Sequence, residues 1–110
     1  MVWIDFVPHI VKTSRFTIGQ RIENKFLDLL ELAYTTYFAK LDQQKIDKIS
    51  ECIFILDIIK FLISISWEAK IIPNHKFEEL TLKLAEIGRM LGGWKEKLEK
   101  IEKKNRLAQS

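Results

Sequence analysis

The residue types that carry most enzyme and metal chemistry are few in this chain, and they stand apart from one another. His9 and His75 are the only histidines, and Cys52 is the only cysteine. Neither histidine has a partner at metal-ligand spacing, and no zinc, di-iron, nucleophile-elbow or phosphate-loop motif occurs. The acidic residues are spread along exposed faces, and most have a lysine one turn away. The sequence therefore predicts no catalytic residues, no metal site, no cofactor and no small-molecule substrate.

The apolar segments give no sign of export or membrane insertion. Cys52 lies in an apolar run, which predicts a buried, reduced thiol in a cytoplasmic protein. The first residues lack the basic and apolar stretches of a signal peptide. The most apolar segment runs from Cys52 to Trp67 and contains Asp57 and Lys60, so it is too short and too charged to span a bilayer. We expect no membrane association.

Positive charge is concentrated in the last third of the chain. Lysine and arginine number 18 against 15 acidic residues, which gives a net charge of +3. Residues 1–72 hold nine basic and nine acidic side chains, whereas residues 73–110 hold nine basic and six acidic ones. This excess fits an anionic partner, and it equally fits lysines that keep a long exposed helix soluble.

The helical periodicity predicts one all-α domain over residues 1–110, an antiparallel four-helix bundle. A short helix is expected over residues 2–12, disturbed by Pro8, and Thr13 and Ser14 can cap a second helix over residues 15–40. Asp42 and Asn74 are the expected N-caps of long helices over residues 43–71 and 74–104. Residues 105–110 are expected to form a frayed tail.

The helix expected over residues 43–71 is apolar on two sides. One stripe contains Ile46, Ile49, Ile53, Leu56 and Ile63, and the other contains Phe54, Ile58, Phe61, Ile65 and Ala69. A helix that is apolar nearly all round must be covered nearly all round, and one small bundle covers only one face of each helix. Self-association is the economical way to cover the rest. The candidate interface residues are Phe54, Ile58, Phe61 and Ile65.

The last helix combines an unbroken apolar seam with a row of small residues. The seam contains Phe77, Leu80, Leu84, Ile87, Leu91, Trp94, Leu98 and Ile101, at steps of three and four. A glycine inside a helix costs about 1 kcal/mol relative to alanine, so a closely packed neighbour would be needed to offset it. The candidates for such close helix packing are Gly19, Ala85, Gly88 and Gly92. The alternative is a kink or an early helix end at Gly92 and Gly93, although the seam continues beyond them.

Two segments resemble a known family. They are Arg15-Phe16-Thr17-Ile18-Gly19-Gln20-Arg21-Ile22 and Glu86-Ile87-Gly88-Arg89-Met90-Leu91-Gly92-Gly93-Trp94. With their spacing they resemble the accessory variability determinant (Avd) proteins of diversity-generating retroelements, within a bacterial class of four-helix-bundle proteins that includes the ribosomal-RNA intervening-sequence proteins. The resemblance runs from Trp3 to about Lys97. It implies a barrel-shaped homopentamer with a basic surface for nucleic acid, which assists the element's reverse transcriptase and template RNA in mutagenic cDNA synthesis without being catalytic.

The chain departs from this family at one basic position. As we align it, the third helix of the family usually shows two basic residues a turn apart, whereas this chain has Lys60 but Ser64. Basic contacts are therefore expected elsewhere, and each arginine has an alternative structural role in capping carbonyls or pairing with a carboxylate. Since no aromatic stacking platform stands out, contacts should be to RNA or DNA phosphates rather than to bases. The candidates are Arg15, Arg21, Lys25, Arg89, Lys95 and Lys97, with the lysines that follow.

Two functional hypotheses result from these observations. The first is an Avd-like accessory scaffold that is oligomeric and binds RNA and a reverse transcriptase. The second is an oligomeric protein–protein adaptor with no nucleic-acid role, which the neutral first two thirds of the chain and Ser64 favour.

Overall fold

The computed structural model describes residues 2–109, with side chains described from Ile18 onward, and all regular secondary structure over that range is helical. Three helices follow one another: α1 (Val2–Tyr37), α2 (Asp42–Glu68) and α3 (Asn74–Gln109). The expected all-α class is thereby confirmed, but the expected count of four helices is not.

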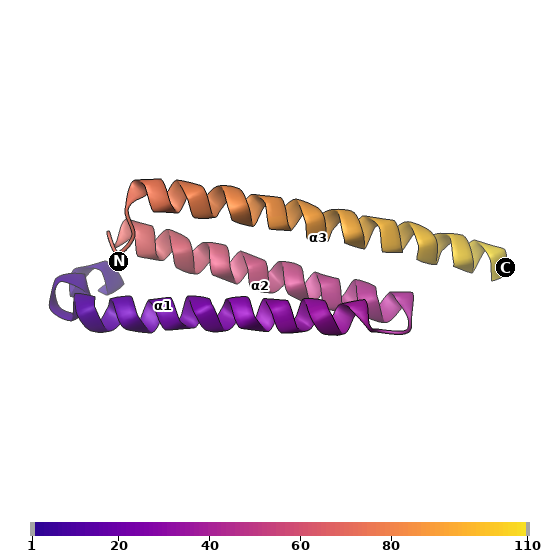
Figure 1. Cartoon of the computed structure of the whole chain (residues 1–110), viewed down its shortest axis with the longest axis horizontal. Helices are drawn as coiled ribbons and strands as arrows, with labels where there is room; N and C mark the ends of the chain where they lie inside the picture. Colours follow the sequence, from indigo (N-terminus) through magenta and orange to yellow (C-terminus); the bar gives the residue numbers. More distant parts are fainter. Residues whose placement is uncertain (1, 110) are drawn as a thin grey trace.

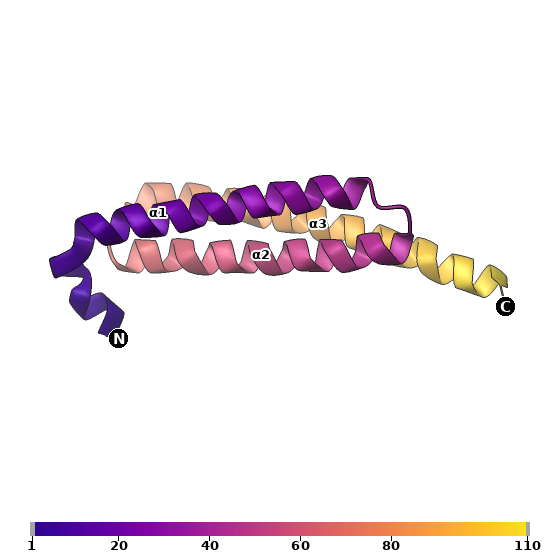
Figure 2. The ribbon, with the colours of Figure 1, turned by 90° about the horizontal axis from the view of Figure 1, so that it is seen from below.

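The missing fourth helix is explained by the N-terminal segment. The sequence predicts separate helices over residues 2–12 and 15–40, whereas α1 is assigned as one helix from Val2 to Tyr37. Figure 2 shows that the N-terminal end of its ribbon turns away from the remainder. The expected break rested on Thr13 and Ser14, yet hydroxyl residues are also compatible with a helix interior. Elsewhere in this chain, Thr36 Oγ1 donates to the Leu32 carbonyl oxygen at 2.6 Å, one turn back in the same helix.

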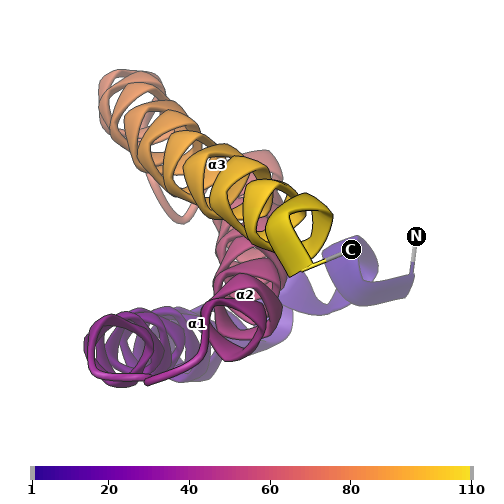
Figure 3. The ribbon, with the colours of Figure 1, turned by 90° about the vertical axis from the view of Figure 1, so that its right-hand side faces the viewer.

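α2 is the central helix, and α1 and α3 pack on two different sides of it. Short connections reverse the chain between successive helices, so neighbouring helices run antiparallel (Figure 1). Seen end-on in Figure 3, α1, α2 and α3 form an open angle with α2 at its corner. No Cα atom of α1 lies within 8 Å of one of α3 in the described chain. The molecule is therefore elongated, with extents of 63 × 22 × 21 Å.

The core follows the side of α2 that both other helices cover. Ile49, Cys52, Leu56 and Ile59 have at most 1% of their surface exposed. They contact buried residues on both neighbouring helices, namely Leu29 of α1 and Leu84, Leu91 and Leu98 of α3. The three leucines of α3 are spaced by seven residues and belong to the predicted seam. The first apolar stripe of α2 and the seam of α3 from Phe77 to Leu98 thus form the core that their periodicity predicts, whereas Ile101, the last residue of that seam, is 39% exposed.

α2 ends at Glu68, three residues before the predicted end at Ile71, because Lys70 adopts a left-handed backbone conformation. Lys70 has a positive φ of 61°. The Ile71 amide donates to the Ser66 carbonyl at 2.8 Å, and the Lys70 amide donates to the Trp67 carbonyl at 2.9 Å. This pair of bonds with a left-handed residue is the Schellman motif, in which glycine is the usual residue. Pro73 then prevents the helix from resuming.

The start of α3 is fixed by side chains from the end of α2. The Trp67 and Phe77 rings stack with centroids 4.5 Å apart. Trp67 Nε1 donates to Asn74 Oδ1 at 2.7 Å, so the Asn74 oxygen that we expected to cap α3 bonds to an indole instead. Asn74 and Asp42 are the first residues of α3 and α2 rather than the residues before them. The hairpin between α2 and α3 is therefore closed by aromatic packing.

α3 continues beyond the Lys104 at which we expected it to end. Residues 105–109, predicted as a frayed tail, are helical, and Ser110 lies outside the described residues. Gly92 and Gly93 lie inside this helix, which excludes the alternative of an early helix end.

Candidate nucleic-acid interface

The outer side of α3 carries a row of cations. Successive residues of an α-helix are about 100° apart, so steps of three and four return to one face. Four exposed cations follow these steps: Arg89, Lys97, Lys100 and Lys104. Gly93 occupies the position on this face between Arg89 and Lys97. We call these four cations the α3 basic stripe, and it is roughly 22 Å long at 1.5 Å per residue. Lys100 pairs with Glu96 at 3.3 Å, whereas the other three form no ion pair with any described residue.

The remaining basic candidates do not join this stripe. Lys95 is half-buried and lies on a different side of α3. Arg21 and Lys25 are one turn apart on α1, and Lys25 Nζ lies 3.9 Å from Asp28 Oδ2. The side chain of Arg15 lies outside the described residues. Of the six candidates named from the sequence, Arg89 and Lys97 therefore share the outer side of α3, whereas Arg21 and Lys25 share a side of α1.

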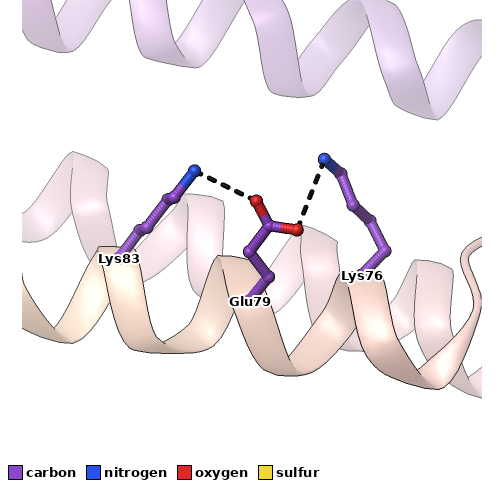
Figure 4. Close-up of polar contacts among 3 residues, drawn as sticks. All are labelled: Lys76, Glu79 and Lys83. Carbon is purple, nitrogen blue, oxygen red and sulfur yellow. Dashed lines mark hydrogen bonds and ion pairs between the residues drawn. The ribbon is translucent and has the colours of Figure 1, made fainter.

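A second charged group, which the sequence analysis did not single out, lies near the start of α3. Lys83 Nζ lies 3.1 Å from Glu79 Oε1, and Lys76 Nζ lies 3.9 Å from Glu79 Oε2. The hydrogen bond from Lys83, with the positive charge of Lys76, lowers the pKa of the Glu79 carboxyl. Figure 4 shows the three side chains pointing away from α3 on the side where α1 lies. The sequence contained a signal for this group, because Lys76 and Lys83 stand three residues before and four residues after Glu79, at the spacing of ion pairs on one helix face.

Only one of the glycines has the close neighbour that the sequence predicts. A Cβ atom built on Gly88 would lie 3.4 Å from Leu56 Cδ2 and 3.8 Å from Lys60 Nζ of α2. Gly19 and Gly92 have no such neighbour within 4 Å, so close packing at these two is not seen within one chain. Ala85 lines a cavity of about 260 Å³ between α2 and α3, together with Lys60, Ile63, Ser64, Phe77, Thr81 and Leu84.

This cavity places the family's two expected basic positions at the junction of α2 and α3. Lys60 and Ser64 both line it, one turn apart on α2. A lysine at position 64 would add a second charge beside Lys60, and the serine leaves Lys60 as the only cation in the cavity wall. This junction therefore carries one cation, whereas the α3 basic stripe carries four.

The apolar interface candidates lie on the side of α2 away from its two neighbours. Phe54 and Phe61 are 65% and 63% exposed, and Ile58 and Ile65 are partly exposed. Ala69, the last residue of the same stripe, is buried. One chain therefore leaves most of the second apolar stripe without cover.

The described side chains include one buried thiol and no cluster suited to metal binding. Cys52 is fully buried beside Thr36, and burial raises the pKa of its thiol. Among residues 18–109, whose side chains are described, no three histidine, cysteine or acidic side chains converge in a way that would hold a metal ion. From Val2 to Gln109, none of the helices combines the length and apolar character needed to cross a bilayer.

Comparison with known proteins identifies the family. The sequence model of the bAvd-like family matches residues 3–98, which include both segments on which the resemblance rests. The chain belongs to the bAvd-like family. Membership makes it an Avd-type accessory protein, a class that is not catalytic. No curated protein and no solved structure matches the chain.

Proposed function

We propose that this bAvd-like protein is an oligomeric scaffold in the bacterial cytoplasm that binds RNA and a reverse transcriptase, and so supports mutagenic cDNA synthesis in a diversity-generating retroelement. The family match over residues 3–98 is the observation that carries this proposal. Family members resemble one another in fold and accessory role, and the resemblance implies a homopentamer. The family's role is an accessory one, so the reverse transcriptase would supply the chemistry.

The α3 basic stripe is the surface that supports RNA binding. Arg89, Lys97 and Lys104 are exposed and unpaired among the described residues, so their charges are not neutralised within the chain. A straight row of cations meets the phosphates of an extended strand or of a helix without reading its bases. Phosphates that bind these cations release condensed counterions, which makes the affinity depend steeply on salt.

A filter-binding experiment with matched variants tests this surface. Arg89→Gln/Lys97→Gln removes two charges from the stripe, and Lys40→Gln/Lys70→Gln removes two exposed charges elsewhere. Each lost phosphate contact should reduce the slope of log affinity against log salt by about one. We expect the stripe variant to bind RNA more weakly at all sequences, with a slope smaller by about two, and the control to bind as the unmodified protein does.

The two possible failures have different meanings. Equal loss in both variants would show that net charge matters and the stripe does not. Absence of RNA retention even at low salt would reject the RNA-binding role and favour the adaptor without nucleic acid, which Ser64 in place of a second basic residue already favours.

The reverse transcriptase is proposed as the protein partner from the family resemblance. Co-purification from cells that express both proteins tests it, and the enzyme should elute with this chain after nuclease treatment. Elution of the enzyme alone would remove it from the proposal.

A further inference from the structure

The cavity between α2 and α3 has an apolar floor. Ile63 and Leu84, which form this floor, are each 2% exposed, and Phe77 is half-buried beside them. The Trp67 ring stacks on the Phe77 ring with its centroid 4.5 Å away, and this contact holds the Phe77 side chain in the cavity wall. The cavity therefore offers an apolar surface that is already formed in the chain without a ligand.

Three polar side chains on the rim of this cavity have no partner among the described residues. They are Lys60, Ser64 and Thr81. Elsewhere on α2, the hydroxyl groups of Ser50 and Ser66 each donate to the carbonyl oxygen one turn back at 2.9 Å. The Ser64 hydroxyl forms no such bond, although it belongs to the same helix. It is therefore available to a molecule that enters the cavity.

Among the described residues, Lys60 supplies the only charge in the cavity wall. Its Nζ atom lies over α3, 3.8 Å from the position that a Cβ atom of Gly88 would take. Gly88 follows Ala85 on α3, so the cation lies at the end of the cavity away from Phe77. A single negative charge could pair with Lys60 and accept hydrogen bonds from the two hydroxyl groups. A doubly charged phosphate would leave one charge unpaired beside the apolar floor, which is unfavourable.

We propose that this cavity binds a small amphipathic carboxylate, with its carboxylate group at Lys60 and its apolar body on the floor. The volume of about 260 Å³ equals that of roughly nine water molecules in the liquid, so a ligand of about ten non-hydrogen atoms fills it. Octanoate has this size. The site is separate from the proposed RNA surface, because no residue of the α3 basic stripe lines the cavity.

Methyl NMR with octanoate as the probe tests the site. A ligand of this size should bind with a dissociation constant of about 0.1–1 mM. Octanoate should shift the methyl signals of Ile63, Leu84 and Ala85, which line the cavity. It should leave the signals of Ile58 and Ile65, on the outer side of α2, unchanged. This pattern separates binding in the cavity from adsorption to exposed apolar side chains.

Variants of single residues test the roles of charge and shape. Lys60→Met replaces an exposed side chain by an uncharged one of similar length, so it should fold unchanged by circular dichroism. We expect it to weaken octanoate binding by about tenfold and to leave the binding of uncharged octanol unaltered. Lys40→Met, which removes an exposed lysine between α1 and α2, is the matched control and should bind octanoate normally. Ala85→Leu fills the cavity and should abolish the binding of both probes.

A further variant tests the preference for a single negative charge. Ser64→Lys places a second cation one turn from Lys60. It should bind octyl phosphate more tightly than octanoate, whereas the unmodified chain should show the reverse order. The same NMR titration measures both ligands.

The contrary outcomes are equally specific. Absence of methyl shifts at millimolar octanoate, or shifts confined to the outer side of α2, would overturn the proposal. Equal losses in Lys40→Met and Lys60→Met would also overturn it, since net charge rather than the cavity would then govern binding. Tighter binding of octyl phosphate or inorganic phosphate than of octanoate by the unmodified chain would replace the carboxylate by a phosphate. The filter-binding test of the α3 basic stripe uses other residues, so either proposal can fail without the other.

Discussion

The two sides of α2 have similar side chains and opposite surroundings. On the inner side, Ile59 is fully buried and Leu56 is 1% exposed, whereas Phe54 and Phe61 on the outer side are 65% and 63% exposed. Both sides follow helical periodicity, so the sequence pattern treats them alike. The apolar side chains on each side of α2 thus indicate that both sides must be covered. Only the positions of α1 and α3 show that a single chain covers the inner side and leaves the outer side exposed. Two predictions compare a covered position with an uncovered one, and a third concerns an exposed ion pair.

The largest difference is expected between Ile59→Ala and Phe61→Ala. Ile59→Ala leaves a cavity between α1 and α2 and should lower the free energy of unfolding by about 2–5 kcal/mol. In dilute, monomeric protein, Phe61→Ala removes a mostly hydrated ring and should lower it by less than about 1 kcal/mol. Urea denaturation followed by circular dichroism measures both values.

Raising the protein concentration sharpens this comparison. If neighbouring chains cover Phe61, its contribution becomes part of the assembly, and the deficit of Phe61→Ala should grow with concentration. The deficit of Ile59→Ala should stay constant. Equal losses for the two variants in dilute protein would show that the outer side is already covered within one chain.

A smaller difference is expected between two glycines of α3. Gly92→Ala meets no atom within 4 Å and should raise the free energy of unfolding by about 1 kcal/mol through helix propensity. At Gly88 the new methyl group would touch Leu56 at 3.4 Å, so the gain should be smaller. Thermal unfolding of the two variants at low concentration gives the comparison, and a larger gain at Gly88 would contradict it.

The smallest effect is expected from Glu79 and depends on pH. Because Lys83 and Lys76 lower the pKa of this carboxyl, the ion pairs stabilise the fold above the ordinary glutamate pKa. That contribution should disappear as the pH falls through the lowered pKa and the carboxyl becomes protonated. NMR titration of the Glu79 carboxyl in the unmodified chain and in Lys83→Met measures its pKa in the two proteins. The variant should shift the pKa upward, and an unchanged pKa would show that Lys83 donates no hydrogen bond in solution.

Much of the fold could be predicted from the sequence because it depends on local periodicity. The seam through Leu84, Leu91 and Leu98 follows from spacing alone, and the start of α3 at Asn74 follows from the break at Pro73, although Asn74 does not cap the helix as predicted. The continuity of α1 could not be predicted, since Thr13 and Ser14 are compatible with both a cap and a helix interior. The early end of α2 depends on Lys70 adopting a conformation that usually marks glycine.

The candidate site was only partly predictable for a related reason. Arg89 and Lys97 could be placed on one face by counting residues, and their common stripe with Lys100 and Lys104 follows in the same way. Which glycine has a close neighbour depends on where α2 lies. The position of one helix relative to another cannot be predicted from the local sequence pattern of either helix. Gly88 has such a neighbour, whereas Gly92, one turn further along, has none.

The lack of backbone contact between α1 and α3 also bears on how the chain opens. Among the described residues, the backbone of each outer helix comes close to that of α2 and not to that of the other outer helix, so one outer helix can detach while the other stays packed on α2. Such an arrangement favours partial unfolding in separate steps over a single cooperative event. If a partner replaced α1, the α2–α3 hairpin would remain, closed by Trp67 and Phe77. If a partner replaced α3, the α1–α2 hairpin would remain. In both cases the partner would bind a folded helical hairpin rather than an unfolded chain.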